Sequence, residues 1–173
     1  MSQPRNSRNR QQGVMLIEAL IAILIFSIGI LAAVGMQGVA IKNVTESRSR
    51  SEASLLAGEL LAQMWMDQNI NVVTGVNTSN LTTANYNYAG AGTPPARLGT
   101  FTPPVSGWIG RVVTKLPGAT TTLPKVTITN PTNAGATVKI EIFWQAPEEA
   151  TLGVMHSHVV MAAVEVSPKP LNP

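Results

Sequence analysis

The most informative side chain able to do chemistry is a single carboxylate in an apolar segment. Glu18 follows four apolar residues and precedes a run from Ala19 to Ile41 that contains no Asp, Glu, Lys or Arg. A carboxylate inside a membrane helix is costly and usually marks function. The alternative is that an acid in the first helical turn is stabilised by the helix dipole at headgroup depth. The residue alone leaves both interpretations open.

The two histidines are the next candidates. His156 and His158 are two residues apart, so a strand would place both on one face, where they could ligate a metal. Only Glu148 and Glu149 lie near, and no third ligand has the spacing to complete a site. We therefore expect exposed strand histidines, with no metal and no cofactor. Without cysteine, a Ser/His/Asp grouping or a phosphate loop, we expect no enzymatic activity.

One long helix is expected to position Glu18. The uncharged run is long enough to cross a bilayer core of roughly 30 Å, which takes about 20 helical residues. No proline interrupts residues 14–67, which predicts a membrane segment over 14–41 and an amphipathic continuation over 42–67. The apolar stripe of that continuation comprises Ala53, Leu56, Leu60, Leu61, Met64 and Trp65.

Charge is distributed unevenly along the chain. Twelve Lys and Arg residues against nine Asp and Glu residues give a net charge of +3, and Arg5, Arg8 and Arg10 lie in the first thirteen residues. The remaining chain is balanced and has no dense basic cluster, so nucleic acid is not an expected partner. The positive-inside rule places the amino terminus in the cytoplasm and the rest on the far side.

Residues 68–173 are expected to form a small exported α+β domain. Residues 77–87 and 90–95 have loop composition, whereas Ser106 to Leu116 predicts a helix that Pro117 and Gly118 end. Alternation predicts strands at residues 126–129, 138–145 and 157–166, separated by a turn at 130–135 and a loop at 147–153. Short connections favour an antiparallel meander packed on the helix stripe. Core packing is the expected role of Trp65, Trp108 and Trp144.

The amino-terminal pattern resembles the class III signal of type IV prepilins. The basic leader, residues 1–13, lacks the apolar region that precedes a secretory cleavage site, and Gly13-Val14-Met15-Leu16-Ile17-Glu18 leads into the apolar run. This resemblance implies that a prepilin peptidase cuts between Gly13 and Val14 and methylates Val14. It also implies that Glu18 pairs with a neighbouring subunit's amino terminus. Val14 stands where the family usually has phenylalanine.

Further segments are similar to the PilV group of minor pilins. They are Ile28 to Gln37, Arg48 with Ala53 to Met64, Trp108 to Gly118 and Val138 to Trp144. Gly35 lies where major pilins usually have a helix-breaking proline, and the disulfide common in major pilins is impossible without cysteine. The resemblance implies a minor pilin that primes or joins pilus assembly. Its partners would be the prepilin peptidase, other minor pilins, the major pilin, the inner-membrane assembly platform and inner-membrane lipid.

Two other functions remain open on sequence grounds. One is a minor pseudopilin of a type II secretion system, which shares the processing signal. The other is a membrane-tethered binding domain or enzyme. Gly29, Gly35 and Gly38 also fall within ten residues of each other, and this segment is where we expect the helix to bend or extend after leaving the membrane.

Overall fold

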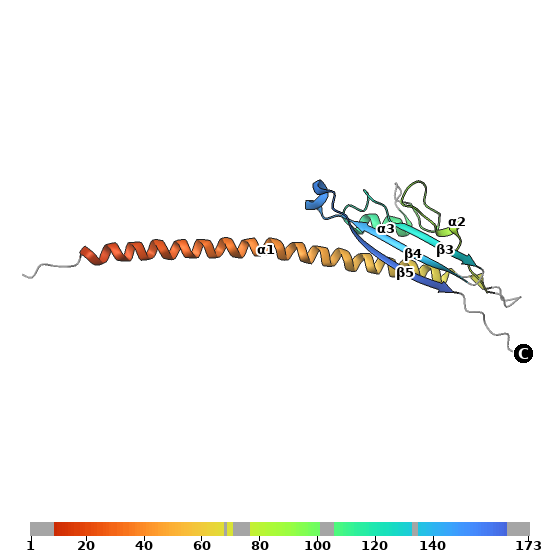
Figure 1. Ribbon diagram of the computed structural model, residues 1–173, viewed down its shortest axis with the longest axis horizontal. Coiled ribbons are helices and arrows are strands. Elements are labelled where there is room, and N and C mark those ends of the chain that lie inside the picture. Colours follow the sequence, from red (N-terminus) through yellow and green to blue (C-terminus); the bar gives the residue numbers. More distant parts are fainter. Residues whose placement is uncertain (1–8, 68, 71–76, 101–105, 133–134, 166–173) are drawn as a thin grey trace, which may run out of the picture. The chain divides into compact units, whose positions relative to one another are not determined.

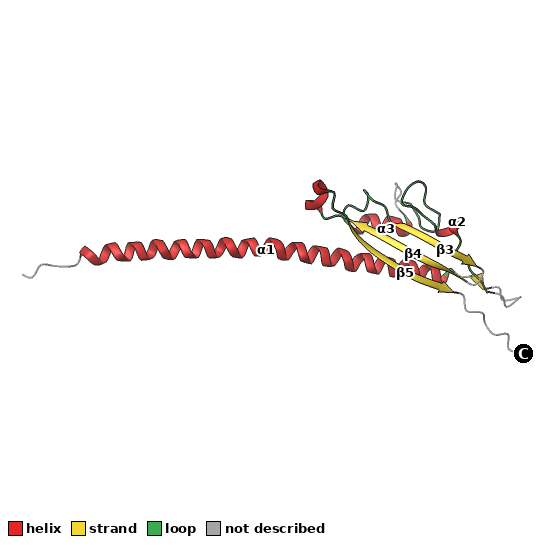
Figure 2. Cartoon of the chain, viewed as in Figure 1, coloured by secondary structure: helices red, strands yellow, loops and turns green. Residues whose placement is uncertain are grey.

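The computed structural model describes residues 9–67, 69–70, 77–100, 106–132 and 135–165 of the 173-residue chain. Helices and antiparallel strands combine in an α+β arrangement, as the sequence predicts (Figures 1 and 2). The elements are α1 (Asn9–Met66), β1 (Asn69–Ile70), β2 (Asn77–Thr78), α2 (Thr83–Tyr86), α3 (Gly107–Lys115), β3 (Lys125–Thr132), β4 (Gly135–Trp144), the 3₁₀ helix η1 (Pro147–Leu152) and β5 (His156–Glu165).

Helix α1 is continuous through the predicted segment, but it begins earlier than expected. It starts at Asn9 within the leader, rather than at Val14, and ends at Met66. Residues 9–12 include no proline and no β-branched side chain, and adding residues to an existing helix costs much less than starting one. The peptide bond between Gly13 and Val14 consequently lies inside helical structure.

The chain divides into two compact units, with the boundary between Thr45 and Glu46 inside α1. In the first unit, every residue from Gly13 to Thr45 is exposed. Apolar side chains therefore cover this part of the helix without any core to enclose them.

In the second unit, one face of α1 enters the core. Ala53, Leu56, Ala57, Leu60 and Met64 are each no more than 1% exposed. The helix period of 3.6 residues places them on one side, as the predicted stripe requires. Trp65 contradicts that prediction because it is 49% exposed; one residue beyond Met64, it is rotated about 100° away from the buried face.

The main sheet is an antiparallel meander in the order β3-β4-β5, which confirms the predicted topology. Val126 pairs with Ile140, and Ile140 in turn pairs with Val160. Alternate residues of β4 from Ala136 to Trp144 are buried, so one face of the sheet closes the core over α1. All three strands begin earlier than predicted, and Val166, the expected end of the last strand, lies outside the described residues.

Two predicted loops contain regular structure. Residues 77–87 include β2, which pairs with β1, and α2, whose first turn is capped by the Thr82 hydroxyl accepting from the Asn85 amide at 3.2 Å. The predicted loop at 147–153 contains η1. The elements β2, α2 and η1 are too short to show an apolar periodicity, so the composition of these segments indicates loops. Residues 90–95 are a loop, as predicted.

The predicted helix after Ser106 is α3, and it packs on α1. Trp108 is fully buried, and its indole Nε1 donates to the backbone oxygen of Leu56 at 2.7 Å. A buried indole normally needs such an acceptor. Trp108 and Trp144 are therefore core residues, as the sequence predicts, and α3 is fixed at the middle of the buried helix face.

Candidate functional site

The predicted processing residues lie in the first turns of α1. Gly13 has no atom within 4 Å of the position that a Cβ would occupy, and the Val14 side chain is 66% exposed. Neither residue is enclosed by the rest of the described chain. The segment is therefore sterically open to another protein.

Glu18 follows Val14 by four residues, so the two lie on the same face of α1. It is exposed, and its neighbours Ile17 and Ile21 are 58% and 50% exposed. Among the residues that the structure describes, none bonds to the Glu18 carboxylate. A carboxylate in such apolar surroundings would need a positive partner from outside the chain once water is excluded.

Gly35 lies in an uninterrupted part of α1. No atom comes within 4 Å of a Cβ built at Gly29, Gly35 or Gly38, and the backbone is helical throughout. The single chain therefore has space for a larger side chain at each position. The expected bend concerns the assembled subunit and stays a prediction.

The histidines differ from the exposed residues that the sequence predicts, since both are only partly exposed. His156 Nε2 lies 2.7 Å from Glu149 Oε2, and its Nδ1 lies 3.4 Å from Glu46 Oε1. Its ring stacks on Trp144 with centroids 5.9 Å apart. No group of three or more His, Cys, Asp or Glu residues in the described chain is arranged to hold a metal.

This cluster ties the end of the sheet to α1. Trp144 Nε1 donates to Glu46 Oε2 at 3.0 Å, so Glu46 contacts β4 through Trp144 and β5 through His156. Gln145 is buried, and its amide donates to the backbone oxygens of Glu149 at 3.3 Å and Val154 at 3.0 Å. These bonds fix the β4–β5 connection. Sequence reasoning placed Glu149 near His156 but missed Glu46, which is 110 residues away along the chain.

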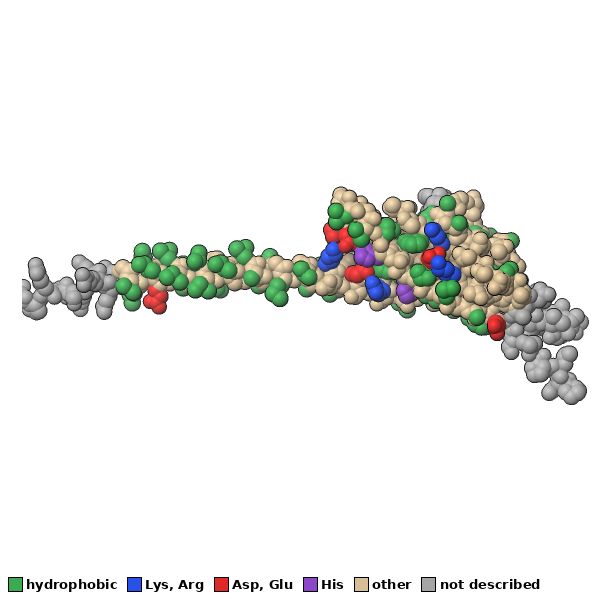
Figure 3. Space-filling model, viewed as in Figure 1, with side chains coloured by type: hydrophobic (Ala, Val, Ile, Leu, Met, Phe, Trp, Pro, Cys, Tyr) green, Lys and Arg blue, Asp and Glu red, His purple; other side chains and the backbone are tan. Residues whose placement is uncertain are grey.

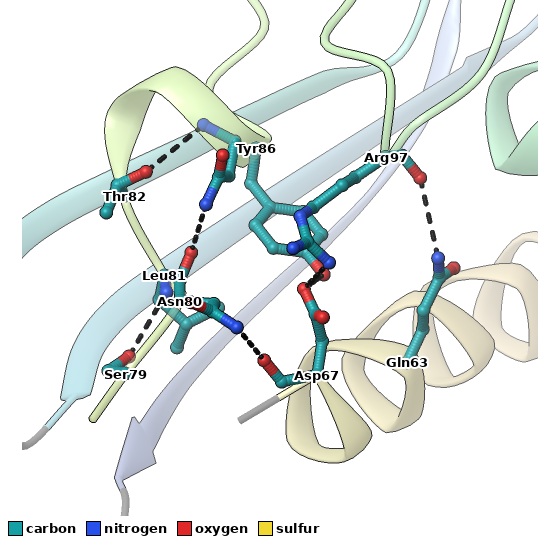
Figure 4. Close-up of polar contacts among 9 residues, drawn as sticks. Gln63, Asp67, Ser79, Asn80, Leu81, Thr82, Tyr86 and Arg97 are labelled. Atoms are coloured by element: carbon teal, nitrogen blue, oxygen red, sulfur yellow. Dashed lines mark hydrogen bonds and ion pairs between the residues drawn. The ribbon is translucent and has the colours of Figure 1, made fainter. Parts of the chain in front are cut away.

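A second polar cluster holds the other end of this helix segment (Figure 4). The Tyr86 hydroxyl donates to Asp67 Oδ2 at 2.6 Å, and Arg97 forms an ion pair with the same oxygen. Asn80 donates to the Asp67 backbone oxygen at 2.8 Å. Burial, the hydrogen bond to Asp67 and the charge of Asp67 raise the pKa of Tyr86 well above its ordinary value. These contacts join residues 79–98 to the end of α1.

The Asp67 cluster has no contiguous signature in the sequence. Its members come from three separate segments, and the composition of residues 77–87 predicts only a loop. The available signal was the tyrosine within a polar stretch, because a large aromatic residue there often packs against the core. Tyr86 is fully buried, and Arg97 lies 6.0 Å from the centre of its ring.

The two units also differ in the chemical character of their surfaces. In Figure 3, hydrophobic side chains follow the first part of α1, whereas the visible face of the second unit carries charged side chains of both signs at several places. Among the described helices, only α1, from Gly13 to Met66, is long and apolar enough to cross a membrane.

Comparison with protein families agrees with this geometry. The model of the "Prokaryotic N-terminal methylation motif" matches residues 8–34, which include Gly13, Val14 and Glu18. No curated protein and no solved structure matches the chain. The motif and the apolar helix suggest membrane anchoring, processing by prepilin peptidase and a structural rather than an enzymatic protein. The match covers the amino-terminal signal and, together with the α+β fold, supports a type IV pilin-like prepilin.

Proposed function

We propose that this chain is a PilV-type minor pilin that primes or joins type IV pilus assembly. The observation that carries the proposal is the methylation motif over residues 8–34, located at the start of an exposed apolar helix. In this proposal, prepilin peptidase cleaves between Gly13 and Val14 and then methylates the new amine of Val14. Other minor pilins, the major pilin and the assembly platform are the partners.

The glycine at the cleavage site has a physical role in this proposal. A protease commonly binds its substrate as extended backbone, and α1 is helical through Gly13 and Val14. Glycine costs a helix roughly 1 kcal/mol relative to alanine, so Gly13 is the easiest point at which to unwind this turn. Its missing side chain also leaves the scissile carbonyl accessible.

The proposed topology follows from the charges at the two ends of the apolar run. Arg5, Arg8 and Arg10 favour a cytoplasmic amino terminus, which leaves the folded second unit in the periplasm. The helix then crosses the inner membrane once. After assembly, the same exposed apolar surface would be covered by other subunits instead of lipid.

Glu18 and Val14 form the proposed assembly contact. Cleavage converts the Val14 amide into an amine, which is cationic near neutral pH. Glu18 is the charged residue of the exposed apolar surface, and we propose that it pairs with this amine on a neighbouring subunit. The pair would neutralise both charges where water is excluded.

The test is mass spectrometry of the protein purified from cells that carry the pilus machinery. We expect the chain to begin at an N-methylated Val14. The variant Gly13→Val should retain its leader, whereas the adjacent control Gln12→Val should still be processed. Retention of Met1 in the unaltered protein, or an amino terminus beyond Ile41, would reject the proposal.

Partner capture distinguishes the two prepilin functions. Purification of the mature protein in mild detergent should recover pilins and the pilus assembly platform. Recovery of type II secretion components instead would show that the chain is a pseudopilin.

A further inference from the structure

We propose that the β4–β5 connection contacts the surface of the bilayer that holds α1. The contact surface is named here the tip loop, residues 147–155, and its apolar members are Leu152 and Val154. Its partner is the headgroup region of a zwitterionic lipid bilayer. This inference rests on the proposed membrane anchoring of α1.

The first argument is the position of the tip loop along the second unit. Trp144 and His156 stand at the two ends of the connection, and both contact Glu46. Farther along α1, Trp108 bonds to Leu56, and Tyr86 bonds to Asp67. The tip loop therefore lies at the Glu46 end of this unit. In Figure 1, it is the blue turn that projects beyond the ends of β4 and β5.

The second argument is the length of chain between Glu46 and the membrane segment. Ile41 is the last residue of the uncharged run, five residues before Glu46. Five residues span about 7.5 Å as a helix and at most about 18 Å when extended. A bilayer's headgroup region is roughly 5 to 8 Å thick on each side. The connecting chain therefore keeps Glu46, which Trp144 and His156 both contact, within this distance of the membrane segment.

The third argument is the surface that the tip loop presents. Leu152 is 73% exposed and Val154 is 43% exposed, although neither is needed to cover the core. Glu149 faces inward to His156, so the exposed acid of the tip loop is Glu148. This composition suits apolar contact with lipid better than attraction to anionic headgroups.

The fourth argument is that the tip loop is held in a fixed conformation. Gln145 binds its backbone at two positions, and the contact between Glu149 and His156 closes it from the other side. Little conformational entropy is therefore lost when lipid covers the exposed side chains. Two apolar side chains bind a bilayer weakly by themselves, but the tether through α1 makes the contact intramolecular.

A matched pair of side chains elsewhere provides the control. Val159 and Met161 on β5 are 47% and 67% exposed, close to the values for Val154 and Leu152. They face outward on the sheet opposite Glu141 and Lys139. Strand β5 leads away from Glu46, since it starts at His156 and rises about 3.3 Å per residue. If exposed apolar side chains bound lipid without regard to their position, both pairs would contact the bilayer. A contact specific to the tip loop involves only Leu152 and Val154.

The experiment uses the full chain in phosphatidylcholine vesicles, with a fluorophore whose emission depends on polarity. Because the protein has no cysteine, Leu152→Cys, Thr127→Cys and Phe26→Cys each provide one labelling site. A lipid carrying a spin label at the top of its acyl chain quenches fluorophores that enter the bilayer. We expect a blue-shifted, quenched signal at positions 26 and 152, and several-fold weaker quenching at position 127.

The three positions separate the possible failures. Quenching at 26 with a signal at 152 equal to that at 127 would overturn the inference and leave anchoring intact. A water-like signal at 26 would reject the proposed anchoring, and the inference with it. Blue-shifted, quenched label at 152, but not 127, supports the contact.

A second measurement tests the apolar side chains themselves. With the label at Ala150→Cys, the double substitution Leu152→Asn and Val154→Asn should reduce quenching several-fold. The matched substitutions Val159→Asn and Met161→Asn should leave it unchanged. Equal effects of both pairs, or no effect of either, would overturn the inference. Circular dichroism confirms that each variant is folded.

Discussion

The two halves of α1 are parts of one helix with different surroundings. From Gly13 to Thr45 every side chain is exposed, whereas from Glu46 to Met66 one face is buried beneath the sheet and α3. The first half has no charged residue between Ala19 and Ile41 and carries apolar side chains on every side, whereas the second half has its buried apolar residues on one face. A helix that is apolar all round needs a partner beyond its own domain, whereas an amphipathic helix can be completed by its own chain.

The two halves of α1 also differ in how their charged side chains are paired. Within the second unit, carboxylates of α1 form ion pairs with basic residues of α3: Glu59 with Arg111 and Glu52 with Lys115, the latter at 2.6 Å. These exposed pairs add little stability, but they orient α3. Glu18 in the first half has no such partner among the described residues. The second half is thus completed within the chain, whereas the proposed function requires lipid or other subunits to cover the first half.

The largest expected effect comes from removing one half or the other. A fragment that starts at Lys42 should remain soluble and unfold cooperatively, because it keeps the entire buried face of α1. A fragment that starts at Gln68 loses that face, together with the acceptors of Trp108 and Tyr86. We expect it to aggregate. Circular dichroism and size-exclusion chromatography compare the folding and the oligomeric state of the two fragments. A monomeric, cooperatively folded fragment starting at Gln68 would contradict the prediction.

Glu18 should matter for assembly and not for folding. In Glu18→Ala, insertion and cleavage should be normal, whereas piliation should fail because a desolvated amine loses its partner. Breaking a buried ion pair from one side costs about 3 to 5 kcal/mol. Immunoblots report processing, and electron microscopy counts pili. Glu18→Asp keeps the charge and should be less impaired; normal piliation by Glu18→Ala would rule out this role.

Substitutions of Leu60 and Leu55 test which face of α1 is buried within the second half. Leu60 is fully buried, whereas Leu55 is 69% exposed. In the fragment starting at Lys42, Leu60→Ala should lower the free energy of unfolding by about 2 to 5 kcal/mol. Leu55→Ala should change it by less than about 0.5 kcal/mol. Urea titration measures both, and similar losses would mean that the buried face is assigned incorrectly.

Tyr86 and Tyr88 provide a smaller comparison within the second unit. The Tyr86 hydroxyl bonds to Asp67, whereas the buried Tyr88 hydroxyl has no hydrogen-bond partner among the described atoms. At neutral pH, Tyr86→Phe should therefore cost about 1.5 to 3 kcal/mol of unfolding free energy. Tyr88→Phe should cost much less. Equal losses in urea titrations of the two variants would contradict the importance of the Asp67 cluster.

The same pair of variants has a pH dependence with a definite sign. The folded-state pKa of Tyr86 is raised above the ordinary value of 10.0. The folded state therefore holds this proton more tightly than the unfolded state, so its contribution is complete below pH 10 and is lost as the pH rises beyond it. Tyr86→Phe cannot ionise at this site. The stability gap between it and the unaltered protein should narrow above pH 10.

Sequence periodicity predicted the long helix, its apolar stripe and the antiparallel meander. Each of these elements repeats a regular spacing of apolar and polar residues over several positions. The long helix extends over many turns, and residues 138–145 alternate over several positions. The same reasoning failed at Trp65, where one residue of helical rotation separates a buried from an exposed side chain. It also failed for α2 and η1, which are too short to show a period.

The polar clusters could not be predicted from the sequence. Glu46 contacts His156, and Asp67 contacts Tyr86, through the fold and not through any local spacing. By contrast, Gly13, Val14 and Glu18 form a continuous motif whose residues can be found without knowing the fold. The candidate processing site could therefore be located from consecutive residues of the sequence. The two polar clusters depend on tertiary contacts between distant residues.

The smallest effect on the isolated chain should come from the glycines of the first half. Replacing Gly29, Gly35 and Gly38 by alanine fills open space and adds helix propensity, roughly 1 kcal/mol per position in water. Insertion and cleavage should be unchanged. If the segment must bend in the assembled subunit, the stiffer helix should reduce piliation, which electron microscopy measures. Gly58→Ala, at an equally open position of the second half, is the control. Full piliation by the triple variant, with an unbroken straight helix in the assembled pilus, would eliminate the bend.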